Sequence, residues 1–549
     1  MKKAIKSVIA ALLVVSTLAG CSSFTGTQSS GTAAQGESAS AGSGKDSITL
    51  YLKNEIPTLN QFSASDNIAF AVLNNISEGL YRLDKENQPQ PALAKDVTIS
   101  DDQLTYTFTL RDGLKWSNGE PLTSKDFQFA WLRQMTADAR NNYSFIMTDY
   151  ITNALEYSEG KATADKVGLE APDDTTLVVH LKAPTPYFLF LTTFVPYFPQ
   201  NEAFFQKQGD NFGLGKDNLI YSGPFTISQY DAASGVTLVK NDNYWDADNV
   251  KISSAKIKII KEQSTAMNLY KAGQLDRVEL SSAEVPSYKE DPEFSTNTIF
   301  RTQFLQINTT AEGTKNVNIR KAISCAIDND LLANTILNNG SEAAVGVVPG
   351  TMSSGVTGKK FSSFQNGLKT FDVAKAKEYW KKGVAELGKE PQLSIVLDDD
   401  TETKDVGTFI QSQLKDNLGI DVTLDSKTKE ARRTLMKSSD YQMGVNAWGA
   451  DYDDAMTYIQ LWADHSVING FRGNFIDESY DKAISDAKAE VDTEKRAEIL
   501  ASAEKYLISD QTVIVPLYYM GSAYLTKSNV KDLFVTHAGT LELKHVSVQ

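Results

Sequence analysis

The segment from Val445 to Asp454 holds the residues of this chain whose types could do chemistry most directly. It reads Val-Asn-Ala-Trp-Gly-Ala-Asp-Tyr-Asp-Asp and lies where a strand pattern ends in a loop before a helix pattern. A carboxylate at a strand end beside tryptophan is suited to hold a desolvated ammonium group. An aspartate in this place could equally cap the following helix. The residues alone leave both roles open for Asp451, Asp453 and Asp454.

Enzyme chemistry has little support in the sequence. The four histidines are scattered, and no pair has the i, i+4 spacing of a helical zinc site. No G-x-S-x-G nucleophile elbow occurs. A glycosidase pair of carboxylates follows no spacing rule, so an exported hydrolase with paired carboxylates stays open as an alternative. We expect a protein that is not an enzyme and that needs no metal and no cofactor.

A second reactive group lies near the N-terminus, where Leu18-Ala-Gly-Cys21 follows lysines and a short apolar stretch. The stretch is too short to span a membrane but long enough for a signal peptide. Small residues before a lone cysteine match the bacterial lipobox, in which the thiol takes a diacylglyceryl group and becomes the mature N-terminus. We therefore expect residues 1–20 to be a signal peptide and Cys21 to be a lipid anchor. The alternative is an ordinary cleaved signal with a cysteine nearby.

Residues 21–45 are almost wholly Ser, Thr, Gly, Ala and Gln. Such a segment cannot bury a core and is typical of a flexible linker. We expect the folded body to be held close to the cell membrane on its extracytoplasmic face. A formal net charge of −15 argues against nucleic acid or an anionic lipid surface as partner. Cys325 is the only cysteine left beside Cys21, so no intrachain disulfide is expected.

The strands and helices that must position the segment from Val445 to Asp454 can be predicted from the hydrophobic patterns of the sequence. Strand patterns fall at 48–52, 104–111, 176–182, 224–230, 236–240, 255–260, 303–308, 393–397, 420–424, 441–447, 512–519 and 523–526. Helix patterns fall at 66–77, 124–134, 318–338, 371–387, 405–417, 477–489 and 493–509. Strands alternate with longer helices in the second half, which is typical of an α/β domain. The length after the linker predicts two or three domains.

Several blocks of sequence resemble the oligopeptide and dipeptide receptors of bacterial ABC importers. The longest block is LTYTFTLRDGLKWSNGEPLTSKDF at 104–127. The others are SGPF at 222–225 with NYW at 243–245, VNIRKA at 317–322 with AID at 326–328, WGADY at 448–452 and PLYY at 516–519. The blocks occur in the family's order and span nearly all of the chain after the linker.

This resemblance implies an α/β, two-lobed, periplasmic-binding-protein-like fold with hinged lobes and an extra inserted α+β domain. Lobe I would be discontinuous, lobe II continuous, and the lobes would close over a peptide. The implied segments are 46–85, 220–298 and 515–549 for lobe I, 86–219 for the inserted domain and 299–514 for lobe II. The ligand would lie extended, with its main chain paired as an added strand and its side chains in roomy, watery pockets.

The resemblance also implies a binding site for the peptide N-terminus. Asp451 looks like the family's carboxylate for the α-ammonium, and Trp448 like the neighbouring pocket residue. The other implied contacts are Asn446, Ala447, Gly449, Glu55, Ile56 and Tyr143. Several family members carry an arginine where this chain has Val445, which cannot form an ion pair with a peptide C-terminus. This difference favours apolar or longer peptides over strict length selection.

The function implied is that of a lipid-anchored receptor that captures peptides and passes them to a permease. The peptides would be oligopeptides, with di- and tripeptides or apolar peptides as variants. The partners would be the transmembrane subunits and their cytoplasmic ATPases, and the receptor would act as a monomer. Alternatives within the fold are a receptor for a peptide pheromone, a nickel chelate or a sugar. Asp451 favours peptides over nickel chelates and sugars.

Overall fold

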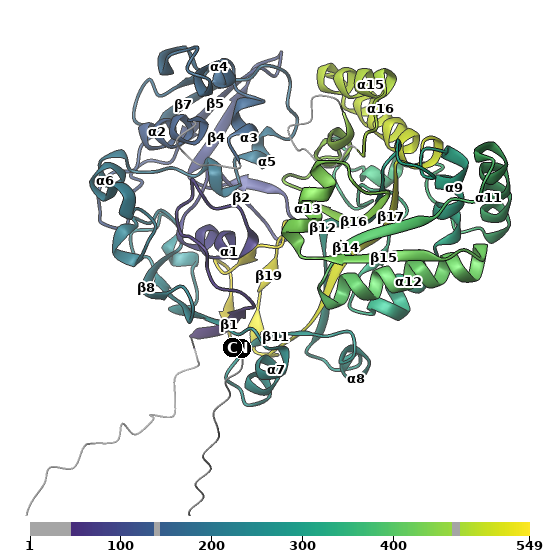
Figure 1. The fold of residues 1–549 in the computed structure, drawn as a ribbon. Helices are drawn as coiled ribbons and strands as arrows, with labels where there is room; N and C mark the ends of the chain where they lie inside the picture. The colour runs from purple at the N-terminus through teal and green to yellow at the C-terminus, as the bar shows by residue number, and fades with distance from the viewer. Residues whose placement is uncertain (1–45, 137–142, 464–472) are drawn as a thin grey trace, which may run out of the picture. The chain divides into compact units, whose positions relative to one another are not determined.

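The computed structural model describes residues 46–136, 143–463 and 473–549 (Figure 1). The predicted signal peptide, the Cys21 anchor and nearly all of the predicted linker lie outside the described residues. In the described ranges, no helix combines the length and the apolar composition that crossing a membrane requires.

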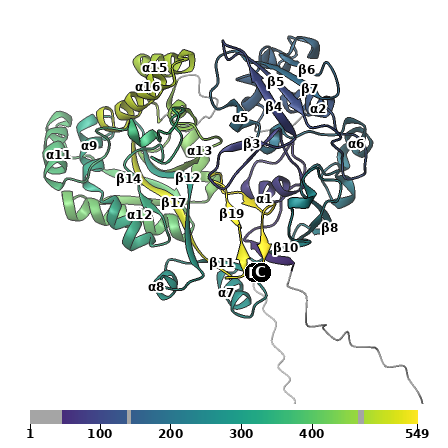
Figure 2. The same ribbon diagram turned by 180° about the vertical axis from the view of Figure 1, so that it is seen from behind.

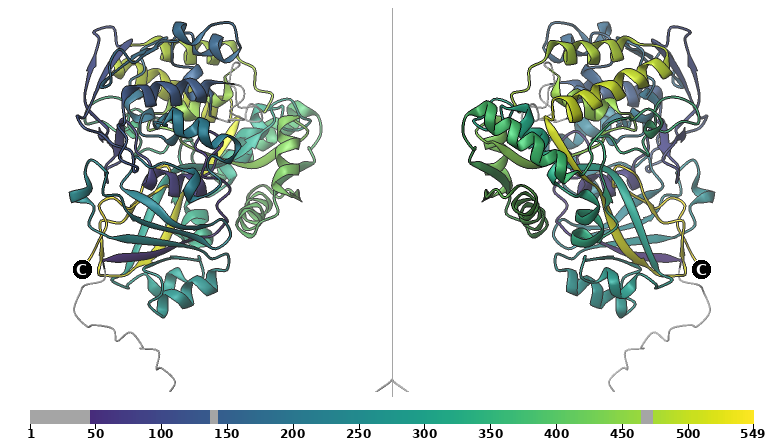
Figure 3. Two further views of the ribbon diagram at one scale, coloured as in Figure 1. Left: turned by 90° about the vertical axis from the view of Figure 1, so that its left-hand side faces the viewer. Right: turned by 90° about the vertical axis from the view of Figure 1, so that its right-hand side faces the viewer.

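The largest sheet has seven strands and includes β16, the strand that ends two residues before Asp451. Its order is β11-β17-β12-β16-β14-β15, and β13 also pairs with β17. The bounds are Arg277–Leu280 for β11, Ile514–Thr526 for β17, Phe294–Ile307 for β12, Met443–Gly449 for β16, Leu393–Asp398 for β14, Val422–Lys427 for β15 and Glu342–Ala343 for β13. The long strands β12 and β17 are antiparallel neighbours (Figure 3). β14 is parallel to β15 and to β16, so helices connect these strands.

Helices α9, α11 and α12 pack against one another beside this sheet (Figures 1 and 2). The helices of this half are α9 Val317–Ala326, α10 Asn329–Leu331, α11 Val373–Leu387, α12 Thr401–Leu418, α13 Lys429–Lys437, α14 Met456–Ile459, α15 Glu478–Ala489 and α16 Thr493–Lys505. The core between helices and sheet includes the fully buried Leu305, Ile395 and Val515. Gly388 ends α11 with a φ of +74°, the left-handed conformation that glycine adopts without strain.

Two four-stranded sheets lie in the first half of the described chain. One has the order β1-β10-β9-β8 and the other β4-β5-β7-β6. The bounds are β1 Ser47–Leu52, β4 Ala94–Ile99, β5 Thr105–Leu110, β6 Leu169–Glu170, β7 Thr176–His180, β8 Phe225–Asp231, β9 Gly235–Lys240 and β10 Ser254–Ile259. Burial alternates residue by residue along β5, as the sequence pattern predicts.

Shorter elements complete the described chain. The remaining helices are α1 Asn67–Ile76, α2 Ser124–Met135, α3 Phe145–Thr148, α4 Ala154–Ser158, α5 Phe188–Leu191, α6 Glu202–Gln208, α7 Gln263–Lys271 and α8 Val285–Tyr288. The remaining strands are β2 Tyr81–Leu83, β3 Pro89–Pro91, β18 Val530–Lys531, β19 Phe534–Val535, β20 Leu541–Glu542 and β21 Ser547–Val548. Asp66 caps α1 by accepting from two backbone N–H groups, of Ile68 and Ala69.

The division into lobes stays a prediction. The sheet of β1, β8, β9 and β10 lies within the segments assigned to lobe I, and the sheet of β4 to β7 lies within the inserted domain. The seven-stranded sheet runs across the predicted boundary at 298, because β12 continues through it. β17 begins at the boundary at 514 and pairs with β12 on both sides of residue 298.

Several predicted elements were wrong in their extent. The strand predicted at 303–308 begins earlier, because β12 runs from Phe294 to Ile307. The helix predicted at 318–338 is interrupted after Ala326 and continues as α10 and a π-helical turn at Leu332–Leu337. The two strands predicted at 512–519 and 523–526 are one strand, β17. Gly521 is needed there because a Cβ atom would lie 2.0 Å from the carbonyl oxygen of Gly340. The glycine thus marks a close backbone approach inside a strand and not a turn.

Candidate functional site

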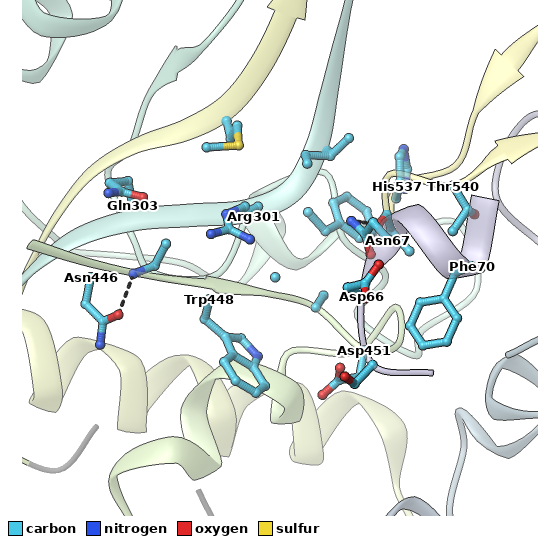
Figure 4. A pocket seen from close by; sticks show the side chains of 18 of the residues that line it. Asp66, Asn67, Phe70, Arg301, Gln303, Asn446, Trp448, Asp451, His537 and Thr540 are labelled. Atoms are coloured by element: carbon cyan, nitrogen blue, oxygen red, sulfur yellow. Dashed lines mark hydrogen bonds between the residues drawn. The ribbon is translucent and has the colours of Figure 1, made fainter. Parts of the chain in front are cut away.

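A cavity of about 1100 Å³ opens among segments that lie far apart in the sequence (Figure 4). Residues of α1, of strands β12 and β16, of α13 and of the C-terminal stretch 537–542 line it. Pockets for small molecules usually have volumes of about 300–1,000 Å³. The cavity is therefore large enough for a ligand of several residues.

Strands β12 and β16 form one wall of this cavity. They pair antiparallel, with Arg301 opposite Gly449. On its other side, β16 pairs with β14 only at Met443 and Gly444. Among the described residues, the stretch 445–449 therefore has a strand partner on one side only. Such an edge can accept an extended peptide as an added strand.

The Asn446 side chain forms hydrogen bonds at this free edge of β16. Its Oδ1 accepts from the backbone N–H of Ala447 at 3.0 Å and from Arg432 Nη1 at 3.3 Å, and its Nδ2 donates to Gln306 Oε1 at 3.0 Å. The dashed line in Figure 4 marks the bond to Ala447. A peptide carbonyl that bonded to the Ala447 N–H would therefore have to replace the asparagine oxygen.

The Asp451 carboxylate faces the cavity and has no partner of opposite charge among the residues that the structure describes. Its backbone N–H donates to Thr457 Oγ1 at 3.3 Å, but no hydrogen bond or ion pair within the described ranges reaches its carboxylate oxygens. Burial raises the pKa of Asp451 to about 7, and no nearby cation lowers it again. An enclosed carboxylate of this kind is suited to receive a cationic ligand group.

The two neighbouring aspartates have structural partners. Asp454 makes a bidentate ion pair with Arg496, at 2.7 and 2.8 Å, and accepts from the N–H of Met456 at the start of α14. Asp453 accepts from the N–H of Ser353 at 2.7 Å. The helix-cap alternative therefore applies to Asp454, whereas the carboxylate of Asp451 stays available for a ligand.

Tyr143 and Asp66 lie near Asp451. The Tyr143 ring packs against Phe70 and Phe194, with ring centroids 5.9 and 5.1 Å apart. Burial raises the pKa of the Tyr143 hydroxyl, and the carboxylates of Asp451 and Asp66 raise it further. Figure 4 shows Asp66 and Asp451 at the same end of the cavity. This end is aromatic and anionic, as a site for an ammonium group requires.

The family model for bacterial extracellular solute-binding proteins, family 5 Middle, matches residues 88–470. The chain belongs to this family. The family 5 assignment confirms the resemblance that the sequence blocks carry, and it agrees with the expectation that the protein is not an enzyme.

Named relatives extend this finding over nearly the whole chain. The chain is 31% identical to the oligopeptide-binding protein OppA of Bacillus subtilis, over 94% of this chain and 95% of that protein. It is similar to the peptide-bound OppA structure from Listeria monocytogenes, with 31% identity, a TM-score of 0.78 and coverage of 92% of this chain and 100% of that one. The substrate-binding domain of an oligopeptide ABC transporter from Bacillus anthracis has 35% identity, a TM-score of 0.78 and coverage of 92% and 99%. These matches confirm the mixed α/β fold class.

Most of the contacts predicted for this family 5 protein line the one cavity. They are Tyr143, Asn446, Ala447, Trp448, Gly449 and Asp451. Glu55 and Ile56 do not line it. The Glu55 carboxylate lies 2.7 Å from Lys261 Nζ, and Ile56 is buried with its N–H bonded to the carbonyl of Ala232. Cys21 lies outside the described residues.

Several cavity residues of this family 5 protein were missed from the sequence. Asp66, Arg301 and His537 line the cavity from three distant segments, and no spacing rule links them. Burial lowers the pKa of His537 to about 4, so its ring is neutral at pH 7. Thr457 also contributes, because its hydroxyl accepts from both the Asp451 N–H and Trp448 Nε1. In the ranges that the structure describes, no group of three or more His, Cys, Asp or Glu side chains is placed to hold a metal ion.

Proposed function

We propose that this family 5 protein captures peptides outside the cell and delivers them to the permease of an ABC importer. The ligand class is supported by the OppA relative, named for oligopeptide binding, and by the Listeria structure, which is bound to peptide. The Bacillus anthracis match, part of an oligopeptide ABC transporter, supports the transport role. The observation that carries the proposal is the enclosed, uncompensated carboxylate of Asp451.

In this proposal the peptide lies along the free edge of β16. Asp451 receives the α-ammonium, and Trp448 and Tyr143 pack beside the first residue. Backbone groups of Ala447 and Gly449, next to the Asn446 side chain, bond to the peptide main chain. Main-chain hydrogen bonds are common to all peptides, so one site can serve many sequences. We keep Glu55 and Ile56 as predicted contacts, although neither lines the cavity in this structure.

Delivery to a permease also requires that the peptide enter and leave the cavity. We propose that the segments predicted as lobe I and lobe II move about hinges to open and close it. A bound peptide would favour the closed arrangement only through contacts with both lobes. The partners proposed are the transmembrane subunits of the importer with their cytoplasmic ATPases, and the receptor acts as a monomer.

The experiment that tests the function separates a receptor from a hydrolase. Purified protein is incubated with a pool of unmodified peptides, separated from unbound material and analysed by mass spectrometry. We expect intact peptides to co-purify, because the site holds the main chain and the N-terminus. N-acetylation of the same pool should remove most of the bound material, because the acetyl group abolishes the positive charge. New peptide termini in the pool would instead identify an exported hydrolase.

We further propose that Cys21 carries the lipid anchor that holds the receptor at the extracytoplasmic face of the membrane. Replacing Cys21→Ser should release correctly folded protein from the membrane fraction, since the serine hydroxyl cannot take the diacylglyceryl thioether. Peptide affinity should stay unchanged, because the substitution changes none of the residues that we propose contact the peptide. Membrane fractionation followed by immunoblotting checks this prediction. Variant protein that stays as firmly membrane-bound as the parent would refute the anchor.

A further inference from the structure

Three tyrosines from distant segments of the chain pack together. Tyr150 and Tyr187 belong to the segment predicted as the inserted domain, and Tyr452 belongs to the segment predicted as lobe II. The rings of Tyr187 and Tyr452 stack, with centroids 4.4 Å apart and an angle of 4° between their planes. Tyr150 contacts Tyr187 edge to face, with centroids 5.7 Å apart. We call Tyr150, Tyr187 and Tyr452 the tyrosine cluster.

Hydrogen bonds join the three hydroxyl groups of the tyrosine cluster. The Tyr187 hydroxyl donates to the Tyr150 hydroxyl, which in turn donates to the Tyr452 hydroxyl, each at 3.3 Å. Gln460 Nε2 also donates to the Tyr452 hydroxyl, at 3.1 Å. The bond between Tyr150 and Tyr452 therefore crosses from the predicted inserted domain to the predicted lobe II.

A buried ion pair of the predicted lobe II also contacts the cluster. The Arg496 guanidinium lies 5.5 Å from the centre of the Tyr187 ring. Asp454 holds this guanidinium through two hydrogen bonds, at 2.7 and 2.8 Å. A cation over the face of an aromatic ring is attracted by the negative charge of that face. Arg496 therefore adds a third contact between Tyr187 and the predicted lobe II.

The tyrosine cluster lies outside the peptide cavity but next to it in the sequence. Among the described residues that line the cavity, none belongs to the cluster, although Tyr452 directly follows Asp451. An opening that separates the inserted domain from lobe II must break the stack of Tyr187 on Tyr452. Stacked rings and buried hydroxyl bonds stabilise the arrangement that contains them. The cluster therefore favours the closed arrangement whether or not a peptide is bound.

Resting on the hinged opening of the proposed function, we propose that the tyrosine cluster sets the fraction of the receptor that is closed before peptide binds. The apparent affinity of a ligand falls in proportion to the fraction of protein in the binding-competent state. The cluster therefore raises the affinity for every peptide by the same factor, without contacting any of them. Tyr150, Tyr187 and Tyr452 are positioning residues, which act by holding the two sides of the cavity together.

Calorimetry on two variants tests this role. Tyr187→Ala removes the stacked ring, and Tyr150→Phe removes the central hydroxyl. The probes are alanine tripeptides, tetrapeptides and pentapeptides, tetrapeptides with Leu, Lys or Glu as the second residue, and N-acetylated tetra-alanine. We expect affinity to fall about tenfold in Tyr187→Ala and about threefold in Tyr150→Phe, by one factor for all probes of a variant. The control Tyr157→Ala removes a half-buried tyrosine of α4 that is not part of the cluster, and it should bind as the wild type does.

Small-angle scattering gives a second readout that does not depend on binding. Without peptide, Tyr187→Ala should have a larger radius of gyration than the wild type, and a saturating peptide should bring both to one value. Urea denaturation checks that the variants are folded, and Tyr150→Phe decides the outcome if Tyr187→Ala is not.

Two results would overturn the role of the tyrosine cluster. One is that the folded variants match the wild type in affinity and radius, and the other is that their losses differ from peptide to peptide, as the loss of a direct contact would. Both results leave the proposed function standing. A wild type that binds no peptide overturns the proposed function instead, and the scattering of the peptide-free variants still decides the role of the cluster.

Discussion

Asp451→Asn should weaken the binding of a peptide with a free N-terminus by about 2–5 kcal/mol. The substitution keeps the shape of the side chain but removes the negative charge that we propose pairs with the ammonium group. Calorimetry with one tight peptide and its N-acetylated form measures the effect. The acetylated peptide should bind the wild type and the variant equally poorly, because neither complex contains the charge pair.

A matched control lies in the same cavity. Asp399 is an exposed carboxylate of the cavity lining, and Asp399→Asn makes the same change in net charge. Its effect on affinity should stay below about 1 kcal/mol, as is usual for an exposed charge. Equal losses in the two variants would show that Asp451 acts only through the overall field of the cavity.

The same carboxylate makes binding depend on pH. The pKa of Asp451 is raised to about 7, so the carboxylate is increasingly protonated below pH 7 and cannot pair with an ammonium group. Affinity should therefore rise with pH up to about 7 and fall again above about 8, where the peptide amine loses its proton. In Asp451→Asn the loss of affinity at low pH should be much smaller. The difference between the two profiles isolates Asp451 from other groups that titrate.

Asp451→Asn should also stabilise the protein in the absence of peptide. The pKa of Asp451 is about 7 in the folded protein against 3.8 for an unperturbed aspartate. The stability that the protonated form contributes is present below about pH 4 and is lost as pH rises through 7. At pH 8 the variant should gain about 1–3 kcal/mol in the free energy of unfolding, allowing for the partial exposure of the side chain. Urea denaturation at pH 4.5 and pH 8 measures this gain, which should be smaller at the lower pH.

The same substitution three residues later, at Asp454, should destabilise the protein. Asp454→Asn should lower the free energy of unfolding by about 3–5 kcal/mol, because it leaves the Arg496 guanidinium buried without its counter-charge. The side chains of both partners are at most 4% exposed, and two short bonds join them. Urea denaturation at pH 7.5 measures the loss.

A conservative change on the same helix provides the control for Asp454. Asp492 caps α16, which also carries Arg496, by accepting from the N–H groups of Glu494 and Lys495. Asparagine caps helices about as well as aspartate, so Asp492→Asn should change stability by less than about 0.5 kcal/mol. A loss below 1 kcal/mol for Asp454→Asn would mean that the buried pair does not hold this loop.

Local sequence patterns predicted the helices and strands that are stabilised by residues close to them in the sequence. The alternation along 104–111 predicted β5, and Thr123 with Asp126 forms the capping box that begins α2. The helix pattern at 371–387 predicted the end of α11 at Leu387, directly before Gly388. These signals work because the groups that pair lie within a few residues of one another.

The break in the helix predicted at 318–338 shows where such signals fail. The apolar pattern continues past Ala326, but the chain becomes extended at Ile327, and distant side chains bind the carbonyl groups at this helix end. Asn417 donates to the carbonyl of Ala326, and the Lys369 ammonium donates to that of Ile327. Carbonyl groups at a helix end need hydrogen-bond donors from outside the helix. Here Asn417 lies 91 residues from Ala326, and Lys369 lies 42 residues from Ile327.

The sequence by itself determined the family, and it predicted the candidate contacts at 446–449 and the chemical suitability of Asp451 for an ammonium group. Only the tertiary structure decided which of the three neighbouring aspartates is available. Asp454 is bound to Arg496, forty-two residues away, and Asp453 to the backbone at Ser353. The tertiary structure also brought Arg301 of β12 and Lys429 of α13 into the lining of one cavity. The sequence specifies which side chains are charged. Whether an opposite charge neutralises a given side chain depends on contacts that only the folded chain makes.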